Sequence, residues 1–138
     1  IYRYEGANRT PLPDPEVESL IAAESKRLGI ARRAISDDEI LLRCMLPLVN
    51  EGANVLADGT ALRPGDIDVV WVYGYGYPAF RGGPMQWADE LGLPHVLETL
   101  RRYEKEFGAH WRPSPLLVEL AESGRRFSDL REPAVTAT

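Results

Sequence analysis

The sequence has 138 residues, 44% hydrophobic and 27% charged, with a formal net charge of −5 at pH 7. This length suits one domain with a hydrophobic core, and the acidic balance disfavours nucleic acid as a partner, because phosphate binding needs a basic surface. No apolar run approaches the roughly 18 residues of a membrane span, and the single cysteine, Cys44, excludes an internal disulfide.

Residues 1–13 are aromatic, polar and interrupted by prolines, and they predict an extended arm that leads from missing upstream domains. The chain shows no signal-peptide pattern. It does not begin with Met, which favours a processed or excised piece. Asp14 and Pro15 then predict a helix start, with a side-chain acceptor at the N-cap and a proline at the first helical position. Apolar residues follow at helical spacing as far as Gly29, which ends this helix.

A second helix is predicted after Ser36, with Glu39 three residues on at the spacing of a capping box. Its broad apolar face runs from Ile40 to Leu56, and we expect Pro47 to kink it. The pair at residues 58–59, Asp-Gly, ends the helix.

The stretch RPGDIDVVWVYG gives conflicting signals. Residues Val69 to Tyr73 favour a strand by propensity, whereas Asp66 and Asp68 lie where the first turn of a helix favours acidic residues. The sequence has no second strand-like run, and a lone strand would leave backbone groups unpaired. We therefore predict a helix.

Three more helices are predicted in the remaining sequence. One runs from Pro84 to Leu91, and the next spans LPHVLETLRRYEKEFG. The last starts with Ser114 at the N-cap and stops at Gly124. The fold class is thus all-α, with five to six helices in a domain at residues 14–130, followed by a frayed tail at residues 131–138.

The glycine-rich stretch YGYGYPAFRGGP has two interpretations. Gly74 and Gly76 match the first two glycines of a dinucleotide loop, but Ala79 stands at the third position. Tyr77 and Pro78 would also block close approach of a pyrophosphate. We interpret the stretch as a turn between helices that lines a domain interface or cleft. The candidate residues are Tyr73, Tyr75, Tyr77, Phe80, Arg81, Gly82, Gly83 and Pro84.

No other group of residues assembles a complete catalytic or metal site, so we expect no catalytic, cofactor-binding or metal-binding residue in this chain. The carboxylates near the start of the second helix suit a solvated, capped helix end, and the charges between Glu98 and Glu106 suit a solvated helix face. His95 and His110 lack an obvious orienting carboxylate. Ser123 and Ser128 have no nucleophile-elbow context.

The segment from LLRCMLPLVNEGANVLADG through GYGYPAFRGGPMQWADELGL resembles the C-terminal helical domain of 3-hydroxyacyl-CoA dehydrogenases, a 6-phosphogluconate-dehydrogenase-type helical fold. The closer similarity is to the last domain of multifunctional β-oxidation enzymes, which join an enoyl-CoA hydratase/isomerase part to a dehydrogenase part. That family carries the helical domain twice in tandem, and this chain resembles the second copy. Leu42 and Arg43 stand where the first copy has Asn-Arg, so the active-site asparagine is absent here.

The resemblance implies a parent that oxidises (3S)-3-hydroxyacyl-CoA to 3-ketoacyl-CoA with NAD and also hydrates enoyl-CoA. It implies that NAD is bound by an upstream Rossmann domain and not by this chain. The expected partners are that Rossmann domain, the first helical copy and, indirectly, acyl-CoA, with a homodimer for the isolated chain. The expected compartment is a bacterial cytoplasm, or a peroxisome in a eukaryote.

Two alternatives stay open. One is a stand-alone helical interaction module that has kept this fold and lost the enzyme. The other, ranked last, is a small hydrolase that uses His95 or His110.

Overall fold

The structure is a computed structural model that describes residues 2–130, and its contacts divide the chain into two compact units, residues 1–36 and residues 37–138. The domain boundaries expected at residues 13 and 130 stay a prediction, and the tail expected at residues 131–138 lies outside the described residues.

The first unit holds a looped segment and one helix. Arg3 and Leu12 form an antiparallel bridge with N–H···O distances of 2.9 and 3.0 Å, so the arm folds back on itself. Helix α1, Pro15–Arg27, starts where the sequence predicts, and the Asp14 carboxylate accepts a hydrogen bond of 3.0 Å from the Glu16 amide. No described side chain of this unit is buried.

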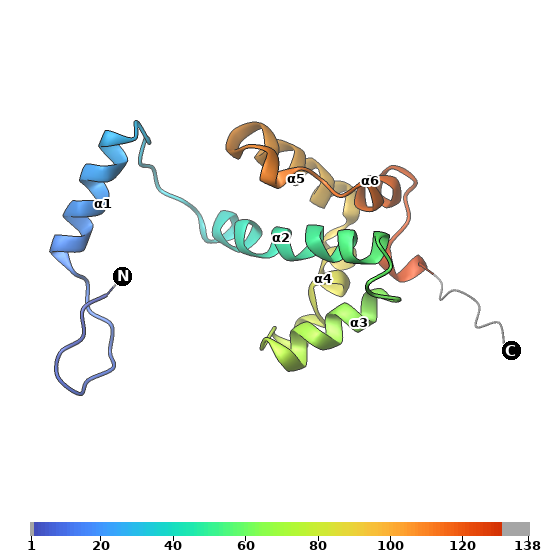
Figure 1. The fold of residues 1–138 in the computed structure, drawn as a ribbon, viewed down its shortest axis with the longest axis horizontal. Coiled ribbons are helices and arrows are strands. Elements are labelled where there is room, and N and C mark those ends of the chain that lie inside the picture. Colours follow the sequence, from blue (N-terminus) through green and yellow to red (C-terminus); the bar gives the residue numbers. More distant parts are fainter. Residues whose placement is uncertain (1, 131–138) are drawn as a thin grey trace, which may run out of the picture. The chain divides into compact units, whose positions relative to one another are not determined.

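The second unit is all-α, as predicted, and Figure 1 labels its helices. The helices are α2 (Asp37–Ala57), α3 (Pro64–Val69), α4 (Pro84–Leu91), α5 (Leu93–Phe107) and α6 (Pro115–Glu122). Helix α3 continues into one turn of π-helix at Val70–Gly74, which confirms the choice of helix over strand for this stretch. Short 3₁₀ turns lie at Ala79–Arg81, Ala109–Trp111 and Phe127–Asp129.

The core forms where α2 packs against α4 and α6, and where α5 packs against α4 and α6 (Figure 1). One side of α2 contributes Leu46, Val49 and Ala53, all fully buried. The other fully buried apolar side chains include Met85, Val96, Leu100, Leu117, Leu120 and Phe127. Helices α2 and α4 approach closely at Gly52, where a Cβ atom would lie 2.5 Å from the sulfur of Met85.

Two polar side chains fix irregular segments onto this core. The amide of Asn50 donates to the Arg112 carbonyl oxygen at 2.9 Å and accepts from the Ser114 amide at 2.7 Å. Asp89 accepts from the Phe127 and Ser128 amides at 2.8 and 2.9 Å. Because backbone groups buried without partners are costly, these contacts hold the start of α6 and the segment after it in place.

Among the described residues, α2 alone is long and apolar enough to cross a membrane by length and composition. Core helices of soluble proteins meet the same criterion, so this is weak evidence for a span. Pro47 lies inside α2, and the kink expected there stays a prediction.

Candidate functional site

The glycine-rich stretch forms an aromatic turn, residues Tyr73–Pro84, between α3 with its π-helical extension and α4. Three of its rings are held out in solvent: Tyr73 is 86% exposed, Tyr75 72% and Phe80 85%. Tyr77 points the other way and is only 6% exposed. The turn therefore presents a cluster of aromatic side chains on a segment that is anchored beneath.

The first anchor of the turn is Tyr77. Its amide donates to the Trp71 carbonyl oxygen at 3.0 Å, and the amide of Tyr75 donates to the same oxygen at 3.2 Å. The Tyr75 ring lies against the Trp71 ring, with centroids 5.0 Å apart. Burial raises the pKa of Tyr77 to about 12, and its hydroxyl has no hydrogen-bond partner within the described part of the chain.

The second anchor is the Asp68 carboxylate of α3, which accepts from the Met85 and Gln86 amides at 2.8 and 3.2 Å. It thereby caps the N-terminus of α4 from a neighbouring helix. Desolvation is the main cause that raises the pKa of Asp68, and the two amide bonds oppose it. Gly83 makes this contact sterically feasible, since a Cβ atom there would lie 2.3 Å from an Asp68 carboxylate oxygen.

The backbone of the turn is used internally. Besides the two amides bound to Trp71, the Arg81 amide donates to the Pro78 carbonyl at 2.9 Å and the Gly82 amide to the Ala79 carbonyl at 3.1 Å. A phosphate-binding loop needs several free amides that converge on the ligand. The segment does not fit a pyrophosphate, and this supports its interpretation as a structural turn.

A groove of about 470 Å³ lies between α2 and α3. Its lining is mostly apolar and comprises Leu48, Glu51, Gly52, Val55, Thr60, Ala61, Leu62, Asp66, Ile67, Val70 and Trp71. Val70 is 55% exposed and Leu62 69%. An ion pair of 2.8 Å joins Asp66 to Arg63, and this hydrogen bond lowers the pKa of Asp66.

Trp71 joins the two features, because it lines the groove and also supports the Tyr75 ring. We call the groove and the exposed rings of the aromatic turn the docking surface. Exposed apolar and aromatic side chains on a rigid support are typical of protein interfaces, and monomer surfaces seldom carry them in contiguous patches. Chemically, this surface suits packing against another apolar surface.

The apolar face expected from Ile40 to Leu56 is divided by the fold. Leu46, Val49 and Ala53 belong to the domain's own core, whereas Leu48 and Val55 line the groove. At the start of the face, Ile40 and Leu41 are also exposed, at 49% and 40%.

The other candidates from the sequence stay apart. His95 is exposed in the first turn of α5, and the ring of exposed His110 lies 5.6 Å from that of Trp111. The Ser123 hydroxyl donates to the Leu120 carbonyl at 3.2 Å. Within residues 2–130, no group of three or more His, Cys, Asp or Glu side chains is placed to hold a metal ion.

The sequence does not predict the roles of three side chains that bind the backbone of distant segments: Asp68, Asp89 and Asn50. Each binds backbone amides that lie 17 to 64 residues further along the chain. For Asp68 the sequence predicts only an acid in the first turn of a helix. The sequence signal for its contact is the pair Gly82-Gly83 just before Pro84, where a close approach to the backbone needs a residue without a Cβ.

Comparison with known proteins agrees with the family resemblance seen in the sequence. A family model described as 3-hydroxyacyl-CoA dehydrogenase, C-terminal domain, matches residues 40–129. The chain is 45% identical to the peroxisomal bifunctional enzyme of Danio rerio over 114 residues, and this match covers 81% of the chain. It is 40% identical over 126 residues to the human enzyme of the same name, which covers 89%.

A bacterial relative is similar over a greater share of the chain. The fatty acid oxidation complex subunit alpha of Shewanella loihica is 33% identical over 130 residues, which cover 91% of this chain. The matches span only 16 to 17% of the length of these three relatives.

Proposed function

Because this chain belongs to the 3-hydroxyacyl-CoA dehydrogenase family through its C-terminal domain, we propose that it is the terminal helical domain of a multifunctional β-oxidation enzyme. The parent oxidises (3S)-3-hydroxyacyl-CoA to 3-ketoacyl-CoA with NAD, and it also hydrates enoyl-CoA. The domain itself packs against its neighbours in the parent and is inactive alone. The observation that carries this role is the docking surface, which is apolar and open at the groove and at the aromatic turn.

The chemistry of the described residues supports a packing role. Arg43, which follows Leu42 at the position of the family's Asn-Arg pair, lies 4.2 Å from the centroid of the Phe107 ring and 3.6 Å from Glu39. Leu42 packs against the core. Both residues thus stabilise the helix packing, and neither offers a group for acid–base chemistry.

NAD fits another part of the parent better than it fits this chain. Four amides of the glycine-rich segment donate to backbone carbonyls, two to Trp71 and two within the segment, and the side chain of Tyr77 is buried. In the proposed enzyme, the Rossmann domain binds NAD, which supplies the hydride acceptor. The residues of this chain support that arrangement by covering an apolar face of the neighbouring domain.

The partner that we propose for the docking surface is the first helical copy of the parent. Helices pack by placing ridges of side chains into grooves, and the mostly apolar groove between α2 and α3 suits an apolar helix ridge. Burial of Val70 and Trp71 would desolvate the centre of the interface, where binding energy concentrates. The two eukaryotic relatives are named as peroxisomal enzymes, which supports a peroxisome if this protein is eukaryotic. For a bacterial parent we propose the cytoplasm.

The enzyme activity is tested with the full-length parent. NADH formation with a 3-hydroxyacyl-CoA substrate should be measured for the parent and for this chain at equal concentration. We expect turnover for the parent and only background for this chain. Turnover by this chain alone would contradict the packing role, and an inactive parent would contradict the dehydrogenase assignment.

The docking role is tested with Val70→Asp, because Val70 is half exposed here and lines the groove. In the parent, an interfacial charge in place of a buried valine should lower the stability by about 1.5–3 kcal/mol or more. In the isolated chain, Val70→Asp should leave the midpoint of urea unfolding almost unchanged. Ala109→Asp, on an exposed 3₁₀ turn, is the control. Equal effects of Val70→Asp in both proteins would overturn the interface.

The stand-alone interaction module stays the alternative. The solution mass of the isolated chain, measured by light scattering, distinguishes this module from a domain of the parent enzyme. If the docking surface is normally covered by the first copy, the isolated chain should associate as its concentration rises, and Val70→Asp should prevent this. A monomer at every concentration would favour the module.

A further inference from the structure

The docking surface has a projecting half and a hollow half. The projecting half is the aromatic turn, where the rings of Tyr73, Tyr75 and Phe80 are exposed. The hollow half is the mostly apolar groove between α2 and α3. Trp71 lies where the two halves meet, because it lines the groove and its ring centroid lies 5.0 Å from that of Tyr75. Both halves are built from residues of the second unit.

The two halves agree in size and polarity. An apolar cavity of about 150 Å³ holds one benzene ring. The groove, at about 470 Å³, therefore has room for more than one ring of the kind that the turn presents. Its lining includes Val55, Ile67 and Val70, and burial of an aromatic ring against such side chains is favourable. The turn of a second copy is thus a suitable occupant of the groove.

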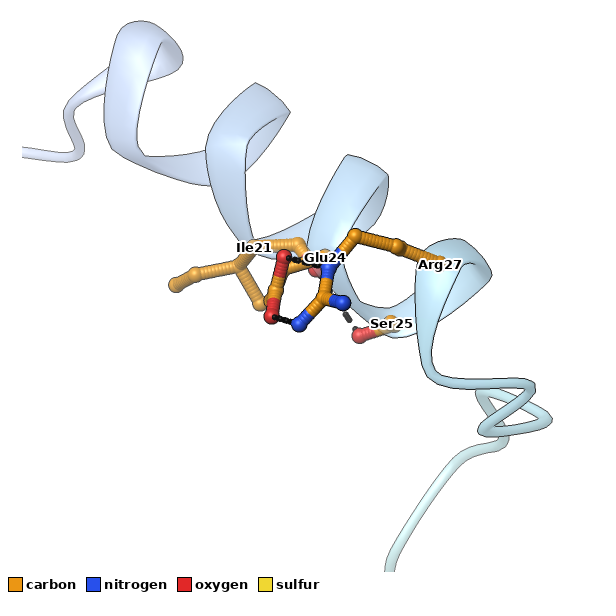
Figure 2. Close-up of polar contacts among 4 residues, drawn as sticks. All are labelled: Ile21, Glu24, Ser25 and Arg27. Carbon is orange, nitrogen blue, oxygen red and sulfur yellow. Dashed lines mark hydrogen bonds and ion pairs between the residues drawn. The ribbon is translucent and has the colours of Figure 1, made fainter.

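Arg81 supplies an open positive charge in the projecting half. Several other arginines are paired within the chain: Arg27, for example, donates to the Glu24 carboxylate at 2.8 Å (Figure 2). Arg81 instead lies over the Phe80 ring, 5.4 Å from its centroid, and joins no ion pair among the described residues. Its guanidinium is therefore available to a carboxylate of a partner.

Glu51 supplies the matching negative charge in the hollow half. It is exposed in the lining of the groove, where its carboxylate accepts a hydrogen bond of 3.2 Å from the Asn54 amide group. The other carboxylate of the groove, that of Asp66, is already paired with Arg63 at 2.8 Å. Opposite charges across an interface fix its register and disfavour wrong pairings. A surface with an open cation on one half and an open anion in the other is complementary to itself.

We propose that two copies of this chain pair about a two-fold axis near Trp71. The aromatic turn of each copy lies in the groove of the other, and Arg81 of each copy faces Glu51 of the other. Both copies of such a dimer use the same surface, so a projecting half must lie beside a hollow half, as it does here. The inference rests on the docking surface of the proposed function, but it does not need the activity of the parent. In the proposed parent the first helical copy occupies this surface, so the dimer is expected for this chain without the parent.

The area of the docking surface is sufficient for a specific dimer. An aromatic side chain buries about 150–250 Å², so the exposed rings of two copies would remove on the order of 1,000 Å² from solvent. The groove walls that these rings cover add to this area. The total then reaches the range of specific protein interfaces, which begins at about 1,200 Å².

The test is the solution mass of this chain, measured by sedimentation over a range of concentrations, with charge reversals at two positions. Arg81→Glu would place two carboxylates opposite each other at both contacts, and Glu51→Arg would place two guanidinium groups there. Each variant alone should raise the dissociation constant of the dimer by at least about tenfold, because like charges across an interface are unfavourable.

Mixing the two variants distinguishes this pairing from a general loss of stability. In a mixed dimer, opposite charges meet at both contacts, so an equal mixture of Arg81→Glu and Glu51→Arg should dimerise like the wild type. The double variant Arg81→Glu/Glu51→Arg should dimerise for the same reason. The control reversals Lys105→Glu and Glu98→Arg lie on exposed positions of α5 outside the docking surface, and they should leave the dissociation constant unchanged.

Three results would overturn the proposal: a wild-type chain that stays monomeric at every concentration, single reversals that dimerise as well as the wild type, or a mixture and a double variant that both stay monomeric. NADH formation by the parent is a separate measurement. An inactive parent, together with a dimer that follows the charges, would refute the proposed activity and leave this pairing standing. An active parent with a monomeric chain would refute the pairing alone.

Discussion

Replacing Gly83 with alanine should break the connection between α3 and α4 that anchors the aromatic turn. A Cβ atom at this position would lie 2.3 Å from an Asp68 carboxylate oxygen and 2.4 Å from the Asp68 Cβ. The second distance involves an atom next to the backbone, so a side-chain rotation of Asp68 does not relieve it. Gly83 also has φ of +113°, a conformation that residues with a Cβ rarely adopt.

Two costs add at this position. The backbone strain of a non-glycine residue in such a conformation is about 1–3 kcal/mol, and overpacking adds about 1–3 kcal/mol more. We therefore expect Gly83→Ala to lower the free energy of unfolding by about 2–6 kcal/mol. A domain of this size has a total of about 5–15 kcal/mol, so the loss would be a large fraction of it.

The assay is urea unfolding of this chain, with Gly65→Ala as the control. Gly65 lies in the first turn of α3, has no atom within 4 Å of an added Cβ and has no positive φ. Alanine there should be neutral or stabilising by about 0.5–1 kcal/mol. If Gly83→Ala unfolded within about 0.5 kcal/mol of the wild type, the proposed anchoring of α4 by Asp68 would be refuted.

Three further changes test the buried polar groups. Asn50→Ala should lower the free energy of urea unfolding by about 2–4 kcal/mol, because the Arg112 carbonyl and the Ser114 amide both lose their partner; a loss under about 1 kcal/mol would contradict this clamp. Tyr77→Phe should raise the free energy of unfolding by about 1–3 kcal/mol, because the buried hydroxyl has no partner in the described structure and regains water only on unfolding; a decrease would contradict this. Ultraviolet titration of the wild type should show one tyrosine with a pKa of about 12. Burial raises the pKa of Asp68 in the folded state, so its protonation favours folding. The free energy of urea unfolding of the wild type should therefore rise relative to that of Asp68→Asn as the pH falls through the raised pKa. A relative decrease over the same pH range would refute this.

The helices could be predicted because their starts carry local signals. Five of the six helices begin with a proline in the first turn: α1, α3, α4, α5 and α6. The choice of helix for Val69 to Tyr73 was confirmed, and the reason was a missing partner strand rather than the propensity of these residues. The capping box of Ser36 and Glu39 stays a prediction.

The sequence was less informative where a contact joins distant segments. Ser114 occupies the N-cap position of α6 as predicted, but its hydroxyl caps nothing and is buried without a partner in the described chain. The Asn50 side chain, 64 residues earlier, binds the Ser114 amide instead. Such contacts depend on which helices meet, and local spacing carries no information about that.

The aromatic turn shows the same limit. Its character as a turn follows from the glycines, but the sequence does not show that Tyr77 is buried while Tyr73 and Tyr75 are exposed. The Tyr77 and Tyr75 amides also share the Trp71 carbonyl oxygen as their acceptor, a contact that the sequence does not predict. The role of these residues at a domain interface therefore stays a prediction that needs the parent protein.

Helix α2 explains why a domain with its own core would still need a neighbour. Leu46 and Val49 pack inward, whereas Leu48 and Val55 lie on the other side and line the groove. A surface helix of an independent domain carries polar residues on its outer side, because water must cover it. The outer side of α2 carries the exposed Glu51, but the groove that Leu48 and Val55 line is mostly apolar and continues to Trp71, which supports the Tyr75 ring. An apolar outer side that is fixed by the same helix as the core will persist whenever the domain folds, so a partner that covers it gains binding energy without ordering the surface first.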